Sequence, residues 1–72
     1  MGIGAEDGMG GLDEAEVIYE FIEMGNVVKV TAIDPDSGTE AVIVGASSAT
    51  RHVLQHNALR KLRYVLAKRA GA

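Results

Sequence analysis

Two turn signals constrain the fold of this 72-residue chain more than any other feature: Gly25-Asn26 and the run Pro35-Asp36-Ser37-Gly38. They separate three short runs rich in Val, Ile, Tyr and Phe, which are residues that strands favour. Loops of two and four residues with this composition are typical of hairpins, because Asn, Asp, Pro and Gly suit the backbone of tight turns. The pattern therefore predicts an antiparallel β-meander in the order 1-2-3, with strands over residues 16–23, 27–34 and 39–44.

The two loops also predict the strand register. If Gly25-Asn26 is a two-residue loop, Phe21 lies opposite Val30, and if Gly38 ends a four-residue loop in the left-handed conformation, Val30 lies opposite Ile43. Because side chains alternate across a sheet, both loops place the same residues on one face. Apart from Glu23 at one rim, this predicted core face is uncharged: Tyr19, Phe21, Val28, Val30, Ala32, Ala41 and Ile43.

The opposite face mixes charged residues with five β-branched apolar residues, Ile18, Ile22, Ile33, Val42 and Val44. Two interpretations stay open at this point. β-Branched residues suit strands wherever they point, and a face this apolar also suits a subunit interface. We expect the five residues to form a protein interface, used by a homodimer or by another protein partner.

A single long helix follows the strands. Ser47, Ser48 or Thr50 can cap it, no Gly or Pro interrupts residues 49–69, and Gly71 stands where helices commonly end. Its apolar residues fall on one stripe, which predicts that the helix packs on the sheet: Leu54, Ala58, Leu59, Leu62, Val65 and Leu66. The expected fold is α+β, a β-β-β-α domain over residues 16–70.

The first fifteen residues have a different composition. They hold acidic residues and five of the nine glycines of the chain, so they lack the apolar surface that repays ordering. We expect residues 1–15 to be a disordered Gly-rich acidic tail, and no mechanism is assigned to it.

The charges of the chain are split along its length. All ten carboxylate side chains lie at or before Glu40, and six of the seven Lys and Arg side chains lie at or after Arg51. The acidic residues of the strands and their loops repel a phosphate backbone, so we expect no nucleic acid on the sheet. Turn aspartates, the acidic tail and bases at the helix end account for part of the split.

A basic flank of the predicted helix is the remaining candidate for binding an anion. It consists of His52, His56, Arg60 and Arg63, with Lys61 on the other side of the helix. The two histidines, four residues apart, lack the further ligands that a metal site needs. A solvated helix flank is the simpler explanation of these residues, and weak binding of nucleic acid or another anion is the alternative.

Other classes of function find little support in the residues. The chain has no cysteine, so disulfides and thiolate metal sites are absent, and its possible acid–base residues Asp34 and Asp36 have roles in a turn. No run approaches the length of a membrane span, and no signal peptide pattern is present. We therefore expect a cytoplasmic protein that is not an enzyme, carries no cofactor and does not enter a membrane.

The segments GNVVKVTAIDPDSGTEAVIVG and ALRKLRYVLAKR resemble a family of short bacterial proteins of unknown function, found chiefly among alphaproteobacteria. The resemblance covers residues 16–69. It implies a stand-alone small protein and no known activity, cofactor or catalytic residue. The prediction for function is thus a protein-interaction or self-association module, with a weak nucleic-acid or anion binder as the alternative.

Overall fold

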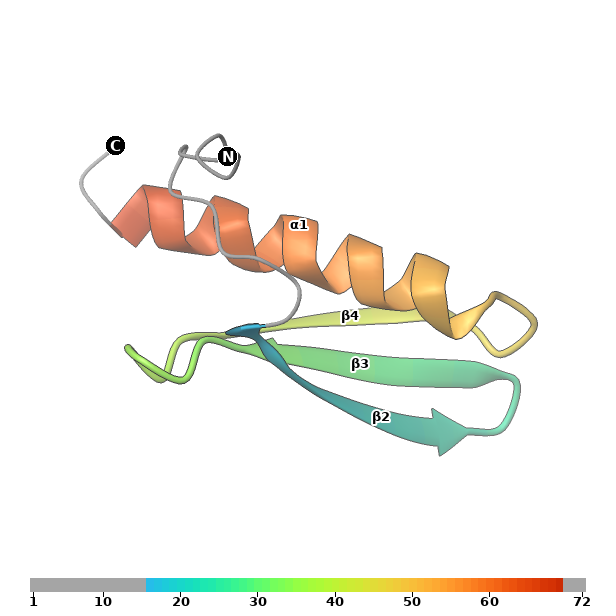
Figure 1. The fold of residues 1–72 in the computed structure, drawn as a ribbon. Helices are drawn as coiled ribbons and strands as arrows, with labels where there is room; N and C mark the ends of the chain where they lie inside the picture. The colour runs from blue at the N-terminus through green and yellow to red at the C-terminus, as the bar shows by residue number, and fades with distance from the viewer. Residues whose placement is uncertain (1–15, 70–72) are drawn as a thin grey trace.

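The computed structural model describes residues 16–69, which form a three-stranded sheet and one helix (Figure 1). In chain order the elements are β2 (Ile18–Met24), β3 (Val27–Ile33), β4 (Glu40–Ala46) and α1 (Arg51–Arg69). The sheet is antiparallel throughout, in the order β2-β3-β4. The predicted β-β-β-α fold is confirmed, whereas the disorder predicted for residues 1–15 and the helix end at Gly71 lie outside the described residues.

The strand register agrees with the prediction from the two turns. Phe21 pairs with Val30, and Val30 pairs with Ile43. Gly25 and Gly38 have φ angles of 67° and 77°, a region that glycine enters without steric cost. β4 extends two residues beyond the predicted end, because its pairing with β3 continues to a hydrogen bond from Ser47 N to Asn26 O at 2.9 Å.

The loop between β3 and β4 is organised by Asp34, a buried carboxylate. Its two oxygens accept hydrogen bonds from the Ser37 hydroxyl at 2.7 Å and from Asp36 N at 3.1 Å. These hydrogen bonds hold the pKa of Asp34 below its ordinary value, because they stabilise the ionised carboxylate. The bond from Ser37 has the largest effect. The turn role expected for this residue is confirmed.

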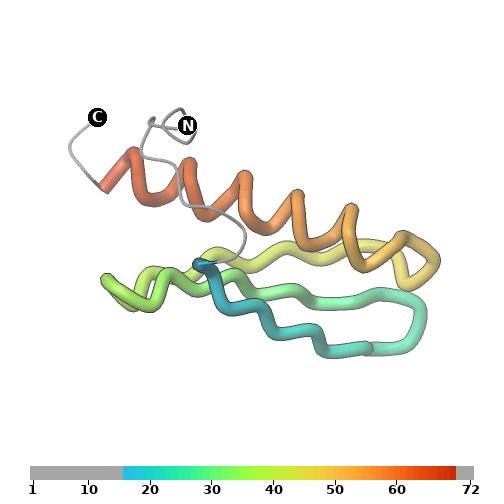
Figure 2. Tube along the Cα trace, viewed as in Figure 1, coloured from blue at the N-terminus to red at the C-terminus, as the bar shows by residue number. Residues whose placement is uncertain are grey.

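Helix α1 begins one residue after Thr50, whose Oγ1 accepts a hydrogen bond from Val53 N at 3.1 Å. Thr50 is therefore the N-cap among the three predicted candidates, and the helix starts at Arg51 instead of residue 49. The helix runs along β4 and β3 and packs against both strands (Figure 2).

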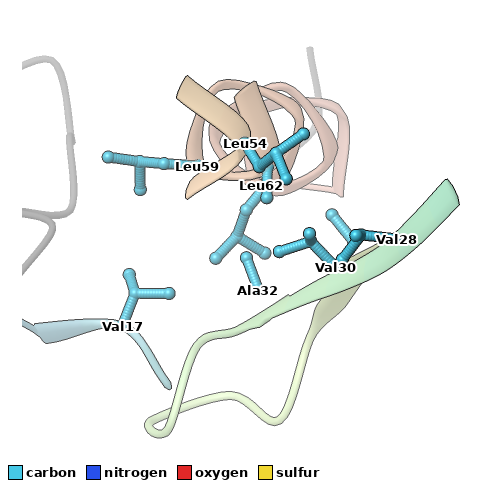
Figure 3. Close-up of a cluster of buried hydrophobic side chains, with 9 residues drawn as sticks. Val17, Val28, Val30, Ala32, Leu54, Leu59 and Leu62 are labelled. Carbon is cyan, nitrogen blue, oxygen red and sulfur yellow. The ribbon is translucent and has the colours of Figure 1, made fainter. Parts of the chain in front are cut away.

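The core lies between α1 and one face of the sheet (Figure 3). Helix residues Leu54, Ala58, Leu59 and Leu62 are buried, and Val65 and Leu66 pack against them, as the apolar stripe predicts. Sheet residues from β3 and β4 complete the core together with Val17, which precedes β2: Val28, Val30, Ala32 and Ala41. Gly45 faces the helix, where the Leu54 side chain occupies the space that a Cβ atom at position 45 would need.

Candidate functional site

The face of the sheet opposite α1, called the outer face from here on, is built from alternate residues of all three strands. Cross-strand pairing arranges them in four rows. The rows are Ile18–Ile33–Glu40, Glu20–Thr31–Val42, Ile22–Lys29–Val44 and Met24–Val27–Ala46. Because α1 packs on the other face, no described element covers these rows.

Six large apolar side chains of the outer face are exposed, with exposed fractions from 37% to 60%: Ile18, Ile22, Met24, Val27, Val42 and Val44. Four of the five interface residues predicted from the sequence are among them, and the fifth, Ile33, is half-buried. Met24 and Val27 were missed, although the predicted register already placed them opposite each other and in phase with Ile22. These exposed apolar side chains thus lie together on one face of the sheet, with Glu20, Lys29 and Thr31 between them.

The charges of the outer face lie among these apolar residues. Glu20 on β2 and Glu40 on β4 are exposed, and Lys29 on β3 is half-buried in the same row as Ile22 and Val44. Within residues 16–69, no opposite charge is paired with Glu20 or Lys29. The outer face therefore offers a mainly apolar surface with one base and two acids at defined positions, and such a surface can bind a protein.

The predicted basic residues of the helix are all exposed on α1: His52, His56, Arg60, Lys61 and Arg63. Lys61 Nζ donates a hydrogen bond to the Val42 carbonyl oxygen at 2.7 Å. This contact occupies a backbone acceptor on the outer edge of β4, where an unpaired strand would otherwise be open to another chain. Binding of an anion by the predicted residues stays a prediction, and Lys61 has a structural role that competes with it.

Other bases also have contacts within the domain. The Arg51 guanidinium lies 4.0 Å from the centre of the Phe21 ring, a cation–π contact. Arg69 Nη1 donates a hydrogen bond to Thr39 Oγ1 at 2.8 Å, which ties the helix end to the loop after β3. Part of the basic character of the helix therefore serves to hold α1 on the sheet.

An open hollow of about 400 Å³ lies where α1 begins, beside the end of β2. Its walls are Phe21, Glu23, Val28, Ser47, Ala49, Arg51 and Leu54. Across residues 16–69, no three His, Cys, Asp or Glu side chains come together as ligands for a metal ion. In the same part of the chain, no helical segment has both the length and the apolar character needed to cross a bilayer.

Comparison with known proteins identifies a family for this chain. Residues 14–69 match the model of a family described as a domain of unknown function, DUF6898. No curated protein and no solved structure matches the chain. The matched residues include all four described elements. The description of this family agrees with the resemblance of the sequence to a family without an assigned activity. The chain, with its β-β-β-α fold, therefore belongs to the DUF6898 domain family.

Proposed function

We propose that this protein is a non-enzymatic self-association module, in which the outer face of one copy binds the outer face of a second copy. The observation that carries the proposal is the set of six exposed large apolar side chains on this one face. Burial of such surface is the main favourable term in protein association.

The size of the domain supports the same proposal. The described core contains nine buried apolar residues, and small domains bury a low fraction of their surface, so many of them gain stability from oligomerisation. A second copy on the outer face would enclose the sheet between two apolar layers. Each sheet would then be covered on both sides, by α1 on one side and by the partner sheet on the other.

The available area is sufficient for a weak dimer. Three strands about 4.8 Å apart, with seven residues each at about 3.3 Å per residue, present a face of roughly 14 Å by 23 Å. Two such faces amount to roughly 640 Å² of flat area, and the relief of the side chains raises the buried surface toward the roughly 1,000 Å² at the lower limit for specific interfaces. Interfaces of this small size are typically weak and transient, so we expect a dissociation constant in the micromolar range.

Sedimentation equilibrium tests the proposal. At roughly 100 μM, well above a micromolar dissociation constant, the wild type should be a dimer, and Ile22→Glu or Val42→Glu should be a monomer because each places a charge in the apolar interface. Val53→Glu is the matched control, since Val53 on α1 and Ile22 are both 47% exposed. A monomeric wild type would contradict the proposal, as would equal dissociation of the Ile22 and Val53 variants.

A further inference from the structure

We infer that the two copies pair about a two-fold axis that runs across the strands, so that Lys29 of each copy meets Glu20 of the other. This inference rests on the proposed self-association and adds the arrangement of the partner. It follows from the positions of the outer-face charges in the four rows. Lys29 belongs to the row Ile22–Lys29–Val44, and Glu20 belongs to the neighbouring row Glu20–Thr31–Val42.

Like charges exclude several ways of stacking two aligned sheets. A two-fold axis along β3 would place Lys29 directly over Lys29 of the second copy. An axis across the strands and through the Lys29 row would do the same, and an axis through the Glu20 row would place Glu20 over Glu20. Juxtaposed like charges oppose association strongly, so these arrangements are unfavourable.

An axis across the strands and between these two central rows gives opposite charges instead. Lys29 of one copy then lies over Thr31 of the second copy, one strand away from Glu20 of that copy. Packed sheets lie about 10 Å apart and neighbouring strands about 4.8 Å apart, distances that a Lys and a Glu side chain together can span. β2 is an edge strand, so the pair forms near the rim, where partial solvation reduces the cost of burying charge.

The same axis matches the apolar residues of the two copies. Val42 lies over Val44 of the second copy, and the outer rows place Ile18 over Met24 and Ile33 over Val27. Aligned sheets normally pack at about −30°, so the central rows keep these pairings more closely than the outer rows, which lie farther from the centre of the interface. The arrangement thus gives two identical Lys29–Glu20 contacts per dimer, with each Glu20 over Ile22 of the second copy and beside its Lys29.

A charge-exchange experiment tests this arrangement. Lys29→Glu and Glu20→Lys should each weaken the homodimer at least about tenfold, because each creates two like-charge contacts. An equimolar mixture of the two variants should form a heterodimer of wild-type affinity, since both contacts then join opposite charges. The chain with both substitutions should also dimerise as the wild type does. Glu23→Lys is the matched control, because Glu23 lies on the same strand but on the opposite face, and it should leave the dimer unchanged.

A second measurement does not depend on variants. Carbodiimide joins a Lys and a carboxylate only when they are in contact, and a mixture of ¹⁴N-labelled and ¹⁵N-labelled protein identifies links between chains. We expect a link from Lys29 of one chain to Glu20 of the other. The arrangement is wrong, and the self-association stands, if Lys29→Glu and Glu20→Lys each dimerise normally while Ile22→Glu is monomeric. The same conclusion follows if the equimolar mixture of Lys29→Glu and Glu20→Lys stays monomeric. A monomeric wild type would instead overturn both.

Discussion

Replacing Val44 by Ala separates association through the outer face from the stability of the fold. Val44 is the most exposed of the six apolar side chains on that face, with 60% of its surface accessible. The substitution should therefore change the free energy of unfolding of the monomer little, because exposed positions usually contribute less than about 0.5 kcal/mol. In the dimer, the exposed part of the side chain becomes buried, so the loss appears in the association equilibrium.

The magnitude follows from the exposed fraction. Val→Ala removes two carbon groups, and burial of each contributes about 0.8 kcal/mol. Because 60% of Val44 is exposed in a single copy and becomes buried only in the dimer, the part of this energy that belongs to association is about 1 kcal/mol per copy. The dimer has two such positions, so association should weaken by about 2 kcal/mol, or about 30-fold in the dissociation constant. Sedimentation velocity over a concentration series from about 5 to about 500 μM covers the expected micromolar equilibrium and its shift.

Val53→Ala provides the comparison for this variant. It makes the same chemical change at a position that is 47% exposed on α1, away from the outer face. We expect its dimer to have the affinity of the wild type. The reasoning would be refuted if both variants weakened association equally, or if Val44→Ala lowered the stability of the monomer as much as it weakened the dimer.

Two further predictions concern the fold itself. Leu62 is fully buried between α1 and the sheet, so Leu62→Ala should lower the free energy of unfolding by about 2 to 5 kcal/mol, measured by urea denaturation; a loss below about 1 kcal/mol would contradict the core as described. The Ser37 and Asp36 hydrogen bonds lower the pKa of Asp34 in the folded state. The ionised carboxylate therefore stabilises the fold at pH values above the unfolded-state pKa, near 4, and this stabilisation is lost as pH falls through the pKa of the folded state. Acid titrations of wild type and Asp34→Asn should therefore differ in stability near neutral pH and converge as pH falls through the lowered pKa of Asp34, and a difference independent of pH would argue against this role.

The sheet could be predicted from the sequence because its determinants are local. Gly25-Asn26 and the Pro35 to Gly38 loop each set a hairpin with a defined number of residues, and strict alternation then assigns every strand residue to a face. The helix and its buried stripe were predictable for a similar reason, because periodicity and the cap at Thr50 depend on neighbours in the chain. The pairing of Phe21 with Val30 and of Val30 with Ile43 confirms both turns.

The contacts of the bases could not be predicted, because they depend on how α1 is placed along the sheet. Periodicity shows which side of a helix faces a sheet, but it does not give the position of the helix along the strands. Only that position brings Lys61 to the Val42 carbonyl, Arg51 over the Phe21 ring and Arg69 to Thr39. Three of the basic residues in the C-terminal part of the sequence thus connect the helix to the sheet or its loop.

For the outer face, the sequence by itself determined which residues share it, and the tertiary structure decided that no element within residues 16–69 covers it. β-Branched residues indicate a strand whether its side chains are buried or exposed, so composition left the state of this face open. A single helix can cover only one face of a three-stranded sheet, and α1 lies on the face with the higher apolar content. That choice, set by packing between segments distant in the chain, leaves Ile22, Val42 and Val44 exposed.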